Sequence, residues 1–278
     1  MSTSAKKDSH YKDFLDIASK AAREGGKILE KYWGKLKNVQ EKKFTGDLVT
    51  EADKESEEVI IRLLNQHYPT HSILSEEGGF YEAKDKEYSW VIDPLDGTTN
   101  YTHQYPFVAV SIGLLRKGKP IVGAIFNPIM NEIFLAAEGE GAFLNGKPIK
   151  VSKVKSLNQS LLATGFAYDR RETFDNNYTE FCFLTHFSHG VRREGSAALD
   201  LAYVAAGRLE GFWERGLNPW DIAAGVILVE EAGGKVTSYE GEDLILGSGR
   251  ILASNGLIHE NLILELKKAH QRRLKFRF

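Results

Sequence analysis

Two aspartates, Asp93 and Asp96, stand in the segment WVIDPLDGTTN, residues 90–100, directly after an apolar stretch. Carboxylate oxygens are the ligands that hard cations such as Mg²⁺ and Mn²⁺ prefer. A strand that ends at Asp93 would place both side chains at a sheet edge, where α/β enzymes keep their sites. Gly97 and Thr98 follow at once, and a helix that begins there would point free N–H groups at an anion. The segment therefore predicts metal-assisted phosphate chemistry.

The same residues also have a purely structural interpretation. Asp-Pro and Asp-Gly are common turn dipeptides, and an aspartate such as Asp96 also caps helices. The complete string is more specific than a bare pair of acids. It resembles the signature of the inositol monophosphatase family, the lithium-sensitive, Mg²⁺-dependent phosphatases, and the resemblance extends over most of the chain. The residues that carry it here are Trp90, Asp93, Pro94, Asp96, Gly97, Thr98 and Asn100.

Two divalent ions that lie close together need more carboxylates than these two. The resemblance adds Glu76, the first acid of the pair Glu76-Glu77, and Asp221, which ends the segment NPWD. It also implies that the backbone carbonyl of Leu95 is a ligand. Taken alone, Glu76 reads equally well as a solvated loop acid, and Asp221 as an acid favoured by a helix dipole. The metal ligands that the resemblance implies are Glu76, Asp93, Leu95, Asp96 and Asp221, and the implied cofactor is Mg²⁺, as two or three ions, with Mn²⁺ as a substitute.

Asp53 has two interpretations. The pattern Thr50-x-x-Asp53 before a helical segment is a capping box, which explains Asp53 by stability alone. In the family, however, the acid of this stretch hydrogen-bonds the threonine of the Asp-Gly-Thr motif, and the pair orients or deprotonates the attacking water. The resemblance thus implies that Asp53, Thr98 and Glu76 are catalytic. Lys42 matches a lysine that the family places near the outer metal, and a solvated lysine fits the sequence equally.

The substrate side of the predicted site lies in residues 191–197, VRREGSA, which join a predicted strand to a helix. Backbone N–H groups and guanidinium groups in such a loop bind hydroxyls or phosphate. The resemblance also assigns polyol recognition to Glu214, for which a solvated charge at a strand end is the alternative. The predicted substrate-binding residues are Leu95, Asp96, Gly97, Thr98, Arg192, Gly195, Ser196, Ala197, Glu214 and Asp221. Segment 165–171, GFAYDRR, resembles the bacterial and plastid branch of the family more than the animal branch.

Composition sets the outer limits. The chain has 278 residues, of which 42% are hydrophobic and 27% charged, as in ordinary globular proteins. The formal net charge of −2 and the pI near 6.5 give no global attraction to nucleic acid or anionic lipid. The basic segment 267–278, KKAHQRRLKFRF, is interpreted as a solvated tail, so no nucleic-acid or acidic partner is expected there.

No stretch approaches the roughly 18 apolar residues of a membrane span, and the polar start of the sequence contains no apolar signal-peptide core. We therefore expect a soluble, cytoplasmic protein. The one cysteine, Cys182, excludes an intrachain disulfide, and its apolar neighbours predict a buried thiol. Patterns of serine hydrolases, zincins and P-loop enzymes do not occur.

Hydrophobic periodicity predicts the elements that must position these residues. Helices are predicted over 11–32, 51–67, 174–186, 196–206, 221–232 and from 257 onward; strands are predicted over 72–74, 88–92, 107–115, 120–126, 132–137, 161–164, 211–214 and 251–254. Asn145-Gly146 predicts a hairpin turn. The first half is predicted to be antiparallel, whereas strands and helices alternate after residue 150.

We expect two parts, residues 1–150 with Glu76 and the Asp93/Asp96 motif, and residues 151–278 with the substrate loop and Asp221. The mixed pattern indicates a layered α+β fold. The resemblance narrows this to the α-β-α-β-α sandwich of the sugar phosphatase superfamily.

The resemblance implies a phosphomonoesterase that hydrolyses myo-inositol 1-phosphate by metal-activated water, without a covalent phosphoenzyme, and that forms a homodimer. A fructose-1,6-bisphosphatase, a histidinol-phosphatase and a nucleotide 3′-phosphatase of the same superfamily remain alternatives, because the metal site does not separate them. A non-catalytic regulatory binding protein is an alternative of a different class. The presence of every expected acid argues against it, because clustered acids without metals repel one another.

Overall fold

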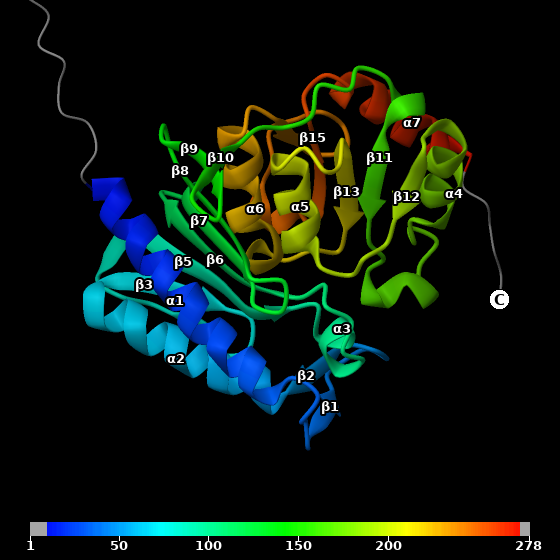
Figure 1. Ribbon diagram of the computed structural model, residues 1–278. Coiled ribbons are helices and arrows are strands. Elements are labelled where there is room, and N and C mark those ends of the chain that lie inside the picture. Colours follow the sequence, from blue (N-terminus) through cyan, green and yellow to red (C-terminus); the bar gives the residue numbers. More distant parts are fainter. Residues whose placement is uncertain (1–9, 273–278) are drawn as a thin grey trace, which may run out of the picture.

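The computed structural model describes residues 10–272 of the chain. Two long helices, α1 (His10–Tyr32) and α2 (Glu51–His67), lie side by side on the outer face of the larger sheet (Figure 1). The apolar residues of α1 recur on one side of the helix, and Phe14, Ala18 and Leu29 are buried there. Both helices match the ranges predicted from periodicity.

The larger sheet has eight strands in the order β10-β9-β8-β7-β6-β5-β3-β4. Its strands are β3 (His71–Ser75), β4 (Gly79–Tyr81), β5 (Asp85–Asp96), β6 (Ala109–Arg116), β7 (Lys119–Asn127), β8 (Glu132–Ala137), β9 (Gly141–Leu144) and β10 (Lys147–Ile149). Only β3 and β5 pair in parallel; the other neighbours are antiparallel, as predicted for the first half. Asn145 and Gly146 both have positive φ, 48° and 76°, so the predicted hairpin turn between β9 and β10 is confirmed.

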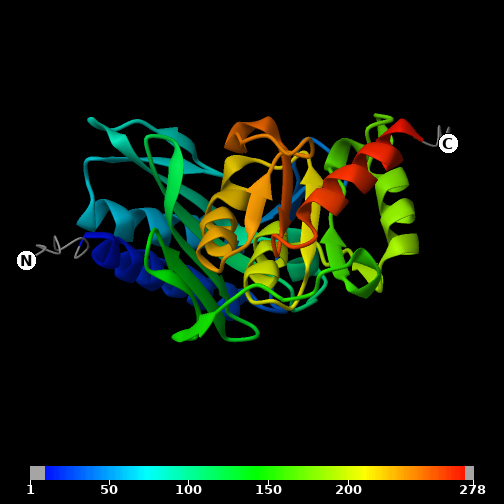
Figure 2. The same ribbon diagram turned by 90° about the horizontal axis from the view of Figure 1, so that it is seen from above.

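The smaller sheet has five strands in the order β12-β11-β13-β15-β14. They are β11 (Leu161–Thr164), β12 (Gly190–Arg192), β13 (Gly211–Arg215), β14 (Lys235–Thr237) and β15 (Arg250–Ser254). Helices α5 (Ala197–Ala205) and α6 (Pro219–Glu231) lie between the two sheets, and α4 (Tyr178–Phe187) and α7 (His259–Gln271) cover the far face of the smaller one (Figures 1 and 2). The predicted α-β-α-β-α layer order is confirmed.

Helix α6 packs closely on the larger sheet because small residues meet at the contact. A Cβ at Gly123 of β7 would lie 2.5 Å from the carbonyl oxygen of Ala224, so only glycine allows this approach. On the other side of the helix, Gly225 leaves room for Leu201 of α5. This packing fixes the N-terminal end of α6, and with it Asp221.

Three details differ from the sequence-based expectations. The helix predicted from residue 174 begins only at Tyr178, because Asn177 takes a left-handed φ of 69° and its side-chain amide binds Gly165 O and Thr164 Oγ1. The prediction of a buried thiol is wrong, since Cys182 is exposed. A helix turns about 100° per residue, so Cys182 lies on the opposite side of α4 from the buried Leu184. A small sheet of β1 (Val39–Glu41) and β2 (Leu48–Thr50) was not predicted.

Among the helices of residues 10–272, none combines the length and the apolar character that a transmembrane segment requires. The polar N-terminal segment and the last six residues of the basic segment 267–278 lie outside the described residues. The change from the first sheet to the second falls between Ile149 and Leu161. One buried core cluster contains residues from both sheets and from the two helices between them. A division into two domains, 1–150 and 151–278, stays a prediction.

Candidate active site

Strand β5 carries the two signature aspartates, but it continues past Asp93 to Asp96 rather than ending at the first acid. Its register with β6 shifts between these two residues. Asp93 is buried, and its Oδ1 accepts a hydrogen bond of 2.9 Å from the amide of Leu95. Gly97 follows with φ 92°, and a Cβ there would lie 3.0 Å from the carbonyl oxygen of Phe107. Glycine is therefore required at the turn that starts the short helix α3 (Thr98–Thr102).

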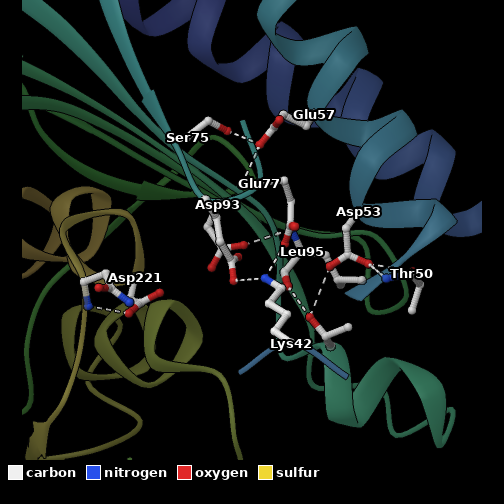
Figure 3. A network of polar contacts seen from close by, with 12 residues as sticks. Lys42, Thr50, Asp53, Glu57, Ser75, Glu77, Asp93, Leu95 and Asp221 are labelled. Atoms are coloured by element: carbon white, nitrogen blue, oxygen red, sulfur yellow. Dashed lines mark hydrogen bonds and ion pairs between the residues drawn. The ribbon is translucent and has the colours of Figure 1, made fainter. Parts of the chain in front are cut away.

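Asp53 makes the contacts that both of its interpretations predict, and its catalytic role stays a prediction. Its Oδ2 accepts from the amide of Thr50 at 2.9 Å and from Thr50 Oγ1 at 2.6 Å, which is the capping box of α2. Its Oδ1 lies 3.2 Å from Thr98 Oγ1, which also lies 3.1 Å from the carbonyl oxygen of Leu95 (Figure 3). Burial, opposed by the Thr50 hydrogen bonds, raises the pKa of Asp53 to about 7. The two interpretations are thus compatible, since each uses a different carboxylate oxygen.

Glu76 follows β3 and joins the site through its backbone and side chain. Its amide donates to the carbonyl of Ile92 at 3.1 Å, which continues the pairing of β3 with β5. Its Oε1 lies 2.8 Å from Lys42 Nζ, which also pairs with Glu77. Burial alone would lower the pKa of Lys42, but these two glutamates outweigh it and raise that pKa above its usual value. Lys42 is thus half-buried and ion-paired rather than solvated, and its place near an outer metal stays a prediction.

Asp96 and Asp221 are each fixed by hydrogen bonds from a helix N-terminus. Asp96 Oδ2 accepts from Ser196 Oγ at 2.6 Å and from the amide of Ala198 at 2.7 Å, at the start of α5. Asp221 Oδ2 accepts from the amide of Asn218 at 2.6 Å in a capping box of α6. Asp221 is therefore an acid at a helix N-terminus, and this position is compatible with metal ligation.

These acids form a cluster in which Asp93 is buried and Glu76, Asp96 and Asp221 are half-buried; they come from β5, from α6 and from the residue after β3. Burial, Glu76, Asp96 and Asp221 together raise the pKa of Asp93 well above its usual value, and burial raises the pKa of Asp96 to about 6 against the Ser196 and Ala198 hydrogen bonds. Burial and the same neighbours raise the pKa of Asp221. Such mutual repulsion is relieved by a bound cation, and all the donors are hard oxygens that suit Mg²⁺.

In residues 10–272 no three acids, imidazoles or thiols are spaced as a finished coordination shell. The fit of the cluster to a divalent cation therefore rests on its charge, burial and oxygen donors. The clustered carboxylates repel one another, so a bound cation would stabilise their ionised forms.

The predicted substrate loop comes close to the signature segment. Gly195 has φ 86°, and its carbonyl oxygen lies against Gly97, while Ser196 caps α5 and holds Asp96. The side-chain amide of Asn100 donates to the carbonyl oxygens of Phe107 and Glu194, at 2.8 and 2.7 Å. Asn100 belongs to the signature, but its role in joining the loop to α3 depends on a contact across 94 positions that no local pattern reveals.

Glu214 lies at the end of β13 and is buried, so the solvated interpretation of this residue does not hold. Its carboxylate packs directly against Gly165, at the start of the GFAYDRR segment. Burial raises the pKa of Glu214 to about 8, and Arg193 opposes that rise. Arg192 instead lines a cavity of about 420 Å³ with Tyr105 and other side chains. Arg193 is thus the arginine whose charge opposes the rise, while substrate contact by Arg192 stays a prediction.

The raised pKa values predict how the stability of the metal-free protein depends on pH. Asp53, Asp96 and Glu214 keep protons in the folded state at pH values where the unfolded chain has released them. Stability is therefore lost as pH rises from about 4 to about 8. Melting temperatures measured in EDTA should fall between about pH 5 and about pH 8, and should recover at the upper end when Mg²⁺ is added. A melting temperature that climbs over this range without metal would contradict the electrostatics described above.

Comparison with known proteins shows the family to which this chain belongs. Residues 10–271 match the model of the inositol monophosphatase family. The chain is 53% identical over 254 residues to an inositol-1-monophosphatase of Synechocystis sp., covering 91% of this chain and 88% of that protein. It is 45% identical to the Nus factor SuhB of Pseudomonas aeruginosa over 246 residues, 87% of this chain and 91% of that one. The solved inositol monophosphatase of Anabaena (Nostoc) superimposes with a TM-score of 0.86 at 56% identity, covering 92% and 96% of the two chains. This chain is a member of the inositol monophosphatase family.

Proposed function

We propose that this protein is a Mg²⁺-dependent phosphomonoesterase that hydrolyses myo-inositol 1-phosphate to myo-inositol and phosphate. The observation that carries the proposal is the cluster of Glu76, Asp93, Asp96 and Asp221 beside the hydrogen-bonded pair of Thr98 and Asp53. Family membership and the inositol-1-monophosphatase relatives support it.

The proposed metal ligands are the four clustered carboxylates and the carbonyl of Leu95, for two or three Mg²⁺ ions, with Mn²⁺ as a substitute. The distance of 3.1 Å between the Thr98 hydroxyl and the Leu95 carbonyl oxygen supports the inclusion of that carbonyl. When bound, the ions would activate water and stabilise negative charge on the phosphate and the leaving oxygen.

The side chains of the protein would orient the reactants. Because Thr98 Oγ1 can donate its proton to Asp53, its lone pairs are free to accept a hydrogen bond from the attacking water. Ionised Asp53 would strengthen that alignment, and Glu76 would hold the water from a second side. The turn amides of Gly97 and Thr98 are proposed to bind phosphate oxygens, as exposed N–H groups at turns do. No covalent phosphoenzyme is needed.

Recognition of the polyol is assigned to the loop Gly195–Ala197 and to Glu214, on the opposite half of the site. Asp96 and Asp221 are proposed to contact substrate as well as metal, and Arg192 to contribute at the rim. A buried carboxylate such as Glu214 is costly unless it accepts hydrogen bonds, and the hydroxyls of a polyol are suitable donors.

Substitution of Glu214 by glutamine tests this assignment. The side chain keeps its shape but exchanges one acceptor oxygen for a donating amide group, so kcat/KM for myo-inositol 1-phosphate should fall by the equivalent of about 1–3 kcal/mol. Hydrolysis of a small aryl phosphate, which lacks the polyol, should barely change. The two substrates are compared in steady-state assays at saturating Mg²⁺. Equal losses on both would refute a substrate role for Glu214.

A panel of phosphate esters tests the proposed substrate. Phosphate release is measured from myo-inositol 1-phosphate, fructose 1,6-bisphosphate, histidinol phosphate and a nucleoside 3′-phosphate. We expect the highest kcat/KM for the inositol ester and inhibition by millimolar lithium, the latter from family resemblance. A higher kcat/KM for another ester would move the assignment to that phosphatase of the superfamily.

We also propose a homodimer, on family resemblance alone. A binding role of a different class has one observation in its favour, since relatives 41–45% identical to this chain are named Nus factor SuhB. The cluster around Asp93 favours catalysis here, because a binding protein gains no stability from acids that repel one another. We propose no nucleic-acid or acidic partner for the basic C-terminal segment.

A further inference from the structure

Helix α2 turns three buried polar side chains toward the segments that carry the site. They are Asp53, Ser56 and Glu57, whose spacing puts them on one face of the helix. Asp53 meets Thr98, and Ser56 Oγ donates to the carbonyl of Pro94 at 3.1 Å. The proposed mechanism uses Asp53 but gives Glu57 no role.

Glu57 contacts the chain on both sides of Glu76. Its Oε2 accepts a hydrogen bond from Ser75 Oγ and another, of 3.0 Å, from the amide of Glu77 (Figure 3). Its Oε1 lies against Gly78, where a Cβ would stand 2.8 Å away. The residues before and after Glu76 therefore both donate a hydrogen bond to the carboxylate of Glu57.

The backbone of Glu76 is thereby held from two directions. Its own amide bonds to Ile92 of β5, one residue before Asp93, and its neighbours bond to Glu57 of α2. The position of the Glu76 carboxylate relative to Asp93 thus depends on the distance of α2 from the sheet. Groups that orient metal ligands in this way usually affect metal affinity when they are removed.

A purely structural role explains Glu57 poorly. The side chain is 7% exposed, and among residues 10–272 it forms no ion pair with a lysine, arginine or histidine. A buried carboxylate without a cation destabilises a fold, and an apolar side chain would fill the same space at lower cost. Its two hydrogen bonds instead go to the residues that flank Glu76.

We propose that Glu57 is a positioning residue that fixes Glu76 for metal binding through Ser75 and the amide of Glu77. The proposal rests on the proposed function, in which Glu76 is a metal ligand. It also distinguishes the two glutamates of the pair, because Glu77 supplies its amide to this contact while its side chain pairs with Lys42.

The test compares four variants of the full chain, Glu57→Ala, Glu57→Gln, Ser75→Ala and the control Glu58→Ala, which changes an exposed acid on the same helix. Mg²⁺ binding to EDTA-treated, dialysed protein is measured by calorimetry without substrate, and melting temperatures are measured in EDTA. Glu57→Ala should weaken Mg²⁺ binding by about 10–100-fold, and Ser75→Ala by a smaller factor. Glu57→Gln should bind nearly as well as the unsubstituted protein, because its amide oxygen can accept both hydrogen bonds. Glu58→Ala should bind normally.

Unchanged Mg²⁺ affinity in Glu57→Ala, with only a lower melting temperature, would overturn the proposal. If Glu57→Ala does not fold, Ser75→Ala decides, since loss of one hydroxyl leaves the helix intact. Failure of the proposed function has a different signature, because the unsubstituted protein would then bind no Mg²⁺ and release no phosphate. If the parent is active and binds Mg²⁺, and Glu57→Ala binds Mg²⁺ with the same affinity, only the role of Glu57 is refuted.

Discussion

Replacement of Asp93 by asparagine is expected to lower kcat by on the order of 10³-fold or more, equivalent to at least ~4 kcal/mol of transition-state stabilisation. Asp93 is the acid whose pKa is raised by burial and by all three of Glu76, Asp96 and Asp221, so it lies at the centre of the cluster. Asparagine keeps its size but removes the charge that would bind two metals. The measurement is kcat on myo-inositol 1-phosphate at saturating Mg²⁺.

The same variant separates chemistry from stability. Without metal, Asp93→Asn should melt at the same temperature as the parent or higher, because one member of a set of repelling buried acids becomes neutral. Asp85→Asn at the other end of β5 is a matched control, since asparagine can still accept the hydrogen bond from the amide of Glu87. Near-normal activity of Asp93→Asn would show that the central metal assignment is wrong.

Asp53→Asn is expected to lower kcat by about 10²-fold while leaving Mg²⁺ affinity and melting temperature nearly unchanged. Asp53 is the third helical residue of the capping box, where an amide oxygen accepts as a carboxylate oxygen does, so the oxygen of asparagine can keep the Thr50 hydrogen bonds. Its amide group would then face Thr98, where Oδ1 now accepts, and the Thr98 hydroxyl would lose that acceptor.

Steady-state kinetics, Mg²⁺ calorimetry and thermal melts on this variant check each part of the prediction. A fully active Asp53→Asn would mean that the capping box is the whole explanation of Asp53. A large loss of melting temperature together with activity would instead point to folding, and the water-orienting role of the Thr98 pair would have no support.

The strongest sequence predictions concern segments whose local pattern dictates their structure. The capping box at Thr50 and the periodicity after it set the start of α2, and the apolar stretch before Asp93 sets β5. Three-residue strands such as β1 and β4 (Gly79–Tyr81) were not predicted, because pairing partners elsewhere in the chain, rather than their own residues, make them strands. For Cys182, the apolar neighbours predicted burial, but its position on α4 leaves the side chain exposed.

The candidate site divides in the same way. The acids are visible in the sequence because each stands in a recognisable motif. The residues that hold these acids in position are not visible, because Ser196 contacts Asp96 across 100 positions and Glu57 contacts Ser75 across 18. The sequence does not distinguish the neighbouring arginines, whereas in the fold the charge of Arg193 acts on Glu214 and Arg192 lines the cavity beside Tyr105. The sequence therefore indicates which groups do the chemistry, and the tertiary contacts show what holds them in place.

The central claim is that the cluster of Glu76, Asp93, Asp96 and Asp221 binds Mg²⁺ for hydrolysis of an inositol phosphate. The most direct test is a titration of EDTA-treated, dialysed protein with Mg²⁺ while phosphate release from myo-inositol 1-phosphate is followed. We predict no release before Mg²⁺ is added, saturable activation by the metal, and no activation of Asp93→Asn over the same range. Phosphate release at full rate in EDTA, or equal activation of the parent and Asp93→Asn, would contradict this account.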